Sequence, residues 1–172
     1  GLFSEASEGE LHELRSFILQ SKWFSEDDML DIHIEVIKRI PMFESFRSRK
    51  LVSLSKGAKW LKPSGVREDL LDDDFVRAES DRERIILSRY LHIQELSKTE
   101  FYKNYVLVRM SDFLPSDGAV SAILQDVKLL VEEDASVKTA LSTTPFVLAC
   151  NGSWQQPSRY DITQSIFYPC LI

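Results

Sequence analysis

Residues 115–131, PSDGAVSAILQDVKLLV, contain the clearest amphipathic pattern of this chain. The segment begins with Pro115-Ser116-Asp117, which are residue types that favour the first turn of a helix. Its apolar residues then recur every three or four positions, and this spacing places them on one face of a helix. These residues are Val120, Ile123, Leu124, Val127, Leu130 and Val131. The pattern predicts a helix with one buried face and makes helices the main element of the fold.

Further helices are predicted on both sides of this segment. Ser80–Glu83 and Ser97–Glu100 are capping boxes, in which a serine and a glutamate satisfy each other's free amides at a helix start. Apolar residues at helical spacing predict a helix near 8–22. A second helix is predicted from an N-cap at Ser25, followed by acids in its first turn, to Pro41, and a short helix is expected at 136–142. The stripe expected to be buried on the helix before Pro41 consists of Met29, Ile32, Val36, Ile37 and Ile40.

Two segments between the helices predict short β-hairpins. In the first, residues 51–54 and 58–61 flank Lys56-Gly57. In the second, Pro145–Cys150 leads into Asn151-Gly152, which is a strong hairpin-turn signal, and a strand returns after it. We therefore expect an α+β fold that is predominantly helical and contains two small β-hairpins.

The two β segments resemble each other and suggest an internal structural repeat. They contain WLKPS at 60–64 and WQQPS at 154–158, and each follows a helix and a proline with a nearby aromatic residue. The alternative is two unrelated hairpins that share common turn residues. We expect residues 1–172 to form a single module whose sub-elements are 8–66, 80–161 and an atypical tail at 162–172.

Composition indicates an ordinary globular protein. The 172 residues are 44% hydrophobic and 28% charged, and 27 acidic against 21 basic residues give a net charge of −6. This balance argues against binding to nucleic acid or to an anionic membrane. No apolar run approaches a membrane span, and residues 1–20 show no signal peptide, so we expect a cytoplasmic protein. Cys150 and Cys170 are expected to be free thiols.

The motifs of common enzyme classes are absent from the sequence. It contains neither a phosphate-binding glycine loop nor a nucleophile elbow. His12, His33 and His92 have no partner at metal-ligand spacing and are expected on helix surfaces or at the edges of core stripes. We therefore assign no catalytic, cofactor-binding or metal-binding residue.

Some residues are candidates for interaction with a partner. Trp60 and Trp154 can serve as interface anchors, and core packing is the alternative. Asp72, Asp73 and Asp74 lie in segment 67–84, which carries eight acids and four arginines. A solvated loop explains this acidic run more simply than a cation site does. A basic cluster precedes the first predicted hairpin and can meet either an acidic partner or the 67–84 segment; it comprises Arg47, Arg49 and Lys50.

Two elements of the chain resemble a known family. IPMFES at 40–45, followed by LVSL at 51–54, is similar to an element repeated in sacsin and its plant relatives. The second element, TPFV at 144–147 with NGSW at 151–154, is similar to the same pattern. RYDI at 159–162 keeps the tyrosine and aspartate of that pattern but lacks its leucine and proline, and the tail that follows looks foreign to the family.

The resemblance implies a chaperone-related role. Sacsin-like proteins are giant cytosolic chains of large repeats, each beginning with an ATPase domain similar to that of the ninety-kilodalton heat-shock chaperone. This chain has none of the ATPase motifs, since Asp117-Gly118 stands without a second glycine. It therefore resembles a non-ATPase part of such a repeat, and no active-site residue carries over.

We expect a non-catalytic interaction or scaffold module of a sacsin-like co-chaperone in protein quality control. Its partners would be a protein client or a neighbouring repeat, and a module without its neighbour can form a homodimer. Two alternatives remain open. One is a nucleotide-dependent enzyme or switch whose site cannot be recognised from the sequence. The other is a small adaptor, for instance in plant defence, whose 67–84 segment binds a basic partner.

Overall fold

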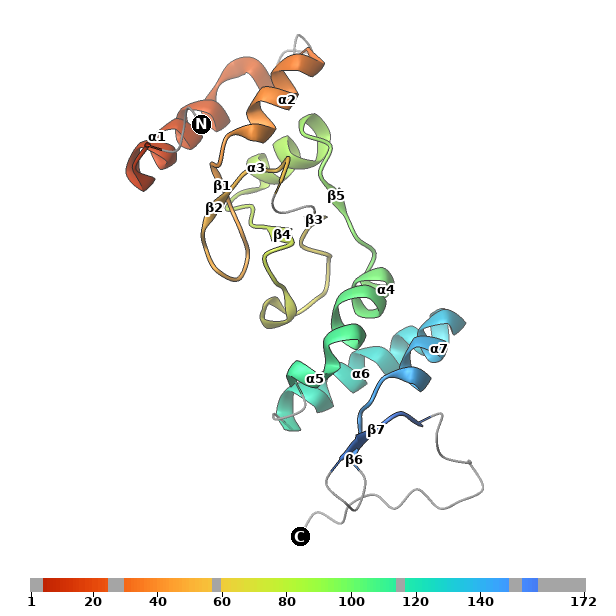
Figure 1. Ribbon diagram of the computed structural model, residues 1–172. Coiled ribbons are helices and arrows are strands. Elements are labelled where there is room, and N and C mark those ends of the chain that lie inside the picture. The colour runs from red at the N-terminus through yellow and green to blue at the C-terminus, as the bar shows by residue number, and fades with distance from the viewer. Residues whose placement is uncertain (1–4, 25–29, 57–59, 114–116, 149–152, 158–172) are drawn as a thin grey trace. The chain divides into compact units, whose positions relative to one another are not determined.

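A computed structural model describes residues 5–24, 30–56, 60–113, 117–148 and 153–157 (Figure 1). The fold is α+β and predominantly helical, as the sequence predicts. The chain divides into two compact units, Gly1–Leu96 and Ser97–Ile172. The expectation of a single module over the whole chain stays a prediction.

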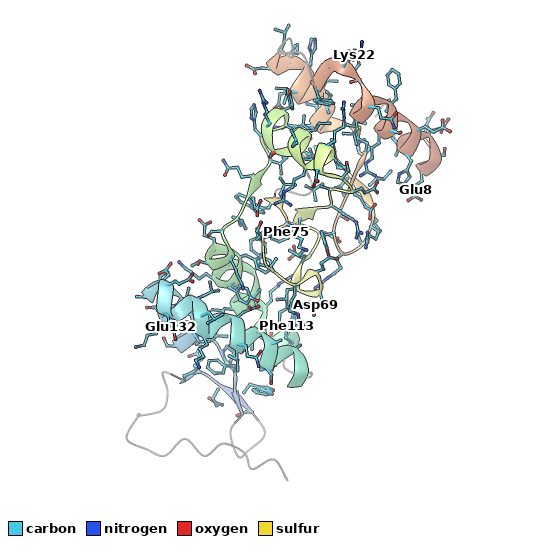
Figure 2. The ribbon with its side chains drawn as sticks, turned by 180° about the vertical axis from the view of Figure 1, so that it is seen from behind. Glu8, Lys22, Asp69, Phe75, Phe113 and Glu132 are labelled. Carbon is cyan, nitrogen blue, oxygen red and sulfur yellow. The ribbon has the colours of Figure 1, made fainter. Side chains whose placement is uncertain are left out.

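The helices of the first unit begin with α1 (Glu8–Gln20), whose two ends lie near Glu8 and Lys22 in Figure 2. A capping box starts α1, because the Ser7 side chain accepts a hydrogen bond from the Glu10 amide and the Glu10 carboxylate accepts one from the Ser7 amide. The predicted helix near 8–22 is thus confirmed. A short 3₁₀ turn, Lys22–Phe24, follows α1.

The second helix, α2 (Asp31–Arg39), ends before Pro41 as predicted. Its predicted start near Ser25 lies outside the described residues. The predicted buried stripe is partly wrong, because Ile32 and Val36 are exposed while Ile34 is buried with Ile37. Met29, the first residue of that stripe, is also outside the described residues.

The strands of the first unit pair differently from the prediction. β1 (Phe43–Glu44) and β2 (Leu51–Val52) form an antiparallel hairpin. β3 (Trp60–Leu61) instead lies parallel to β4 (Phe75–Val76) and to β5 (Gln94–Glu95). The predicted pairing of 51–54 with 58–61 is therefore wrong.

Backbone contacts explain the observed pairing. The Asp73 carboxylate accepts hydrogen bonds from the amides of Arg47 (3.1 Å) and Ser48 (2.7 Å), and these bonds hold the turn between β1 and β2. The Phe46 amide donates to the Phe75 carbonyl (2.9 Å), and the Arg77 amide donates to the Glu44 carbonyl (2.8 Å). The hairpin is thus tied to β4, where its backbone groups are satisfied.

The core of the first unit combines its helices with these strands. After β4 and a short turn, α3 (Asp81–Ile85) continues as a π-helical segment, Ile86–Tyr90, before β5. Phe75 lies in the interior of the unit in Figure 2 and is fully buried. One cluster of buried residues draws on both helices and strands and includes Ile18, Phe24, Ile34, Ile37, Met42, Phe43, Leu61, Val76, Ile86, Leu87 and Leu91.

The second unit starts with α4 (Lys98–Phe101) and a π-helical segment, Tyr102–Val106. A 3₁₀ turn and α5 (Met110–Phe113) follow. The capping box of Ser97 and Glu100 is complete, since each side chain bonds the other residue's backbone amide. This prediction is therefore confirmed.

The predicted amphipathic helix is α6 (Asp117–Glu133). Ile123, Val127 and Leu130 of its stripe are buried, which confirms the predicted apolar face. The short helix expected at 136–142 is α7 (Ala135–Thr143), which Asp134 caps by accepting a hydrogen bond from the Ser136 amide.

The second predicted hairpin is confirmed, because β6 (Val147–Leu148) pairs antiparallel with β7 (Trp154–Gln155). Its predicted turn, Asn151-Gly152, lies outside the described residues, as does the tail 162–172. Trp154 thus belongs to an antiparallel hairpin, whereas Trp60 belongs to a parallel sheet. This strand pairing gives no support to the predicted internal repeat.

Candidate functional site

A hollow of about 490 Å³ lies between α1 and the start of α3. Most of its lining side chains are polar or charged. We call this hollow the Arg15 pocket, and its lining residues are His12, Arg15, Ser16, Leu19, Gln20, Glu79, Ser80, Arg82 and Glu83.

Two ion pairs cross this pocket. The Arg15 guanidinium lies 2.6 Å from the Glu83 carboxylate and 3.0 Å from that of Glu79. The Arg15 and Glu83 side chains are 5% and 4% exposed, whereas Glu79 is 55% exposed. Burial by itself lowers the pKa of Arg15, but the bonds and charges of both glutamates raise it overall. Arg15 therefore stays charged inside the protein.

The start of α3 is built around the same carboxylate. The Ser80 hydroxyl accepts a hydrogen bond from the Glu83 amide (3.2 Å), as the predicted capping box requires. The Glu83 carboxylate, however, accepts from the Glu79 amide (2.8 Å) rather than from that of Ser80. The box is therefore half formed, because its glutamate turns toward Arg15 and the preceding residue.

A second arginine strengthens the connection between the helices. Arg82 donates hydrogen bonds to the carbonyls of Leu19 (3.1 Å) and Ser21 (3.3 Å) at the end of α1. These bonds satisfy carbonyls that have no partner within the helix. Arg15 and Arg82 thus fasten α1 to α3 at two places.

The contacts of this pocket hold α1 in place. Hydrogen bonds from Arg15 lower the pKa of Glu79. This ion pair joins α1 to the residue that precedes α3. Sequence patterns could not reveal the pair, since Arg15 and Glu83 are 68 positions apart.

A second feature is a set of exposed apolar side chains between residues 17 and 36. Each of them is between 54% and 67% exposed. Ile32 and Val36 are four residues apart on α2 and therefore neighbours on one helix face. We call the set the N-terminal apolar residues: Phe17, Trp23, Leu30, Ile32 and Val36.

The two tryptophans that the sequence suggests as interface anchors lie in different units. Trp60 is half-buried in the central strand of the β4-β3-β5 sheet, and its amide donates to the Asp74 carbonyl (3.1 Å). Trp154 is half-buried in β7. Trp23, which sequence reasoning did not single out, is more exposed than either and lies among the N-terminal apolar residues.

The acidic candidates are engaged with the backbone of their own unit. Asp72 accepts a hydrogen bond from the Asp74 amide (3.0 Å), and Asp73 holds the turn after β1. Desolvation raises the pKa of Asp73, but bonds from Ser48, Ser45 and Arg47 lower it overall. In the part of the chain that the structure describes, no group of three or more acidic, histidine or cysteine side chains is placed to hold a metal ion.

The basic cluster Arg47, Arg49 and Lys50 lies in the loop between β1 and β2, where one side chain and one backbone amide bind acidic residues of the same unit. Arg49 forms an ion pair with Glu44 (2.8 Å), and the Arg47 amide binds Asp73 of the 67–84 segment. The predicted helix-surface position is confirmed for His12 and His33. His12, His33 and His92 are exposed, the first two on helices and the third just after one.

None of the helices in the described ranges is long and apolar enough to cross a membrane. Comparisons of the chain with protein-family models, with curated proteins and with solved structures found no match.

Proposed function

We propose that this chain is a non-catalytic protein-interaction module that acts as a scaffold in a sacsin-like co-chaperone of cytoplasmic protein quality control. The N-terminal apolar residues carry the proposal. Five large apolar side chains between residues 17 and 36 lie more than half exposed. Arg15 and Arg82 bind α1 to the start of α3, and buried Ile34 and Ile37 hold α2 in the core of the unit. Apolar side chains presented on a fixed scaffold suit the binding of apolar protein segments.

Two further observations bear on this proposal, and the second weighs against the adaptor alternative. The elements that resemble sacsin, 40–45 and 51–54, contribute the β1–β2 hairpin of the first unit. Asp72 and Asp73 bind backbone amides of their own unit, so they are poorly placed for the adaptor function in which this acidic segment binds a basic partner.

The experiment measures binding of the full chain to reduced, carboxymethylated α-lactalbumin, a protein that cannot fold. We expect Ile32→Gln combined with Val36→Gln to weaken this binding about tenfold, because both side chains lose their apolar surface. Glutamine is a good helix former, so α2 should persist. Circular dichroism verifies that the variant is folded.

The matched control replaces two exposed apolar residues of the second unit. Val108 and Leu129 are 74% and 58% exposed, and their double replacement by glutamine should leave the affinity unchanged. Equal weakening by both pairs of substitutions would contradict a specific surface. Wild-type protein that does not bind the unfolded client would contradict the chaperone-type function altogether.

A further inference from the structure

A second hollow, of about 240 Å³, lies within the first unit. Its floor is apolar, since the side chains of Phe46, Leu61 and Val76 are buried. The remaining lining is mostly charged. We call it the Arg77 pocket, and its polar or small lining residues are Lys62, Glu68, Arg77, Ala78 and Arg84.

Arg77 is the unusual residue of this pocket. Its backbone is fixed by the bond from its amide to the Glu44 carbonyl, and its guanidinium lies 5.7 Å from the centre of the Phe46 ring. Its Nη1 atom is buried and has no hydrogen-bond partner. Among the described residues, no carboxylate lies within ion-pair distance of this guanidinium. A buried donor without an acceptor is costly, and this cost is relieved when the guanidinium moves to meet an oxygen that enters the pocket.

The other two cations of the pocket already have partners. Lys62 lies 3.1 Å from the Glu68 carboxylate, and Arg84 forms an ion pair with Glu95. Arg84 also donates to the backbone carbonyl of Lys62 (3.4 Å), which fixes the Arg84 side chain relative to the backbone at Lys62. Together with these ion-pair partners, the pocket has three cations and two carboxylates, so its net charge is +1 in a chain whose net charge is −6. This local excess of positive charge attracts an anion.

We propose that the Arg77 pocket binds a small organic carboxylate, with its oxygens at the Arg77 guanidinium and its apolar part against Phe46, Leu61 and Val76. The planar guanidinium matches the two oxygens of a carboxylate. The buried floor suits a short branched alkyl group better than water. The volume is below the roughly 300–1,000 Å³ of pockets for drug-sized ligands, so the ligand has only a few heavy atoms.

The experiment titrates the full ¹⁵N-labelled chain with isovalerate and follows the Arg77 Nε–Hε signal by NMR. We expect a saturable shift. Isovaleramide, which has the same shape without the charge, should bind about tenfold more weakly. Inorganic phosphate should also bind more weakly, because it has no alkyl group for the floor. Equal affinity for the amide or for phosphate, or the absence of a saturable shift, would overturn the proposal.

Substitutions provide the second arm. Arg77→Leu should raise the dissociation constant for isovalerate about tenfold. This constant is measured from the shifts of backbone amide signals near the pocket. Arg89→Leu is the matched control, because Arg89 also lies over an aromatic ring, that of Tyr90 at 5.5 Å, but outside the pocket. If Arg77→Leu does not fold, Arg77→Lys replaces it in the experiment. Lysine keeps the positive charge but lacks the planar guanidinium, so this variant should weaken binding at least threefold. Unchanged affinity in the folded Arg77 variant would reject this site.

Discussion

Arg15 and Glu83 each place a charge in the interior of the first unit, and each depends on the other. Their side chains are 5% and 4% exposed, and the oxygen of Glu83 lies 2.6 Å from the Arg15 guanidinium. A buried charge that loses its partner is left without water or counter-ion. We therefore expect Arg15→Met to lower the free energy of unfolding by about 3 kcal/mol, measured by urea denaturation at pH 7.

Two further variants separate the buried pair from the exposed one. Glu79 is 55% exposed, so Glu79→Gln should cost less than about 1 kcal/mol. Combining Arg15→Met with Glu83→Leu removes both charges and should recover most of the stability lost in the single variant, because apolar pairs commonly replace buried ion pairs without loss. A double variant less stable than Arg15→Met alone would show that the charges are not the cause.

At the scale of elements, the end of the helix that begins with α3 depends on a strained residue. His92 follows the π-helical segment with φ of 53°, a conformation that costs a residue with a Cβ about 1–2 kcal/mol. It is also exposed, so few contacts would be lost by its removal. We expect His92→Gly to raise the free energy of unfolding by about 0.5–1 kcal/mol, after allowing for the greater freedom of glycine in the unfolded chain.

The opposite change provides the control for this prediction. Gly65 has φ of 70°, and a Cβ added there would meet no atom within 4 Å. Gly65→Ala should therefore cost about 1 kcal/mol through backbone strain alone. Thermal unfolding of both variants measures the two effects. A destabilised His92→Gly variant would indicate that the imidazole makes a contribution beyond its backbone conformation.

The helices could be predicted from sequence because their signals are local. The Ser97–Glu100 box lies within one turn, and the stripe of α6 repeats over several turns. The pairing of β1 with β2 could not be predicted in this way. Each strand has only two residues, too few for an alternating pattern, and the turn between them is held by Asp73, more than 20 positions away.

The candidate sites were harder to predict than the elements. On α2, apolar residues occur on more than one face, and the spacing of Ile32 and Val36 suits burial as well as that of Ile34 and Ile37. Only the three-dimensional structure shows that Ile34 and Ile37, and not Ile32 and Val36, are buried in the core. The Arg77 pocket has no sequence signature, because its lining comes from several separate segments between residues 46 and 84.

At the scale of the whole molecule, carboxylates connect segments that are distant in sequence. A hydrogen bond from Arg15 lowers the pKa of Glu79. Desolvation raises the pKa of Glu95, but bonds from Ser64 and Arg84 lower it overall. The stability that such groups contribute is present above the ordinary glutamate value of 4.5 and is lost as the pH falls through their lower pKa in the folded protein. The free energy of unfolding should therefore decrease below about pH 4.5.

Glu79→Gln tests this linkage directly. Glutamine keeps a side-chain oxygen that can accept from Arg15, but it does not titrate. In the wild type, Glu79 takes up a proton at a higher pH in the unfolded chain than in the folded protein. The free energy of unfolding therefore decreases as the pH falls. Urea denaturation between pH 7 and pH 3 should show a shallower acid decrease for Glu79→Gln than for wild type. Gln125→Lys is the control, because it changes the net charge by the same amount on an exposed residue without removing a carboxylate. If the free energy of unfolding of both variants decreased equally less with acid than that of the wild type, the acid sensitivity would come from the overall charge of the molecule and not from the connection between α1 and α3.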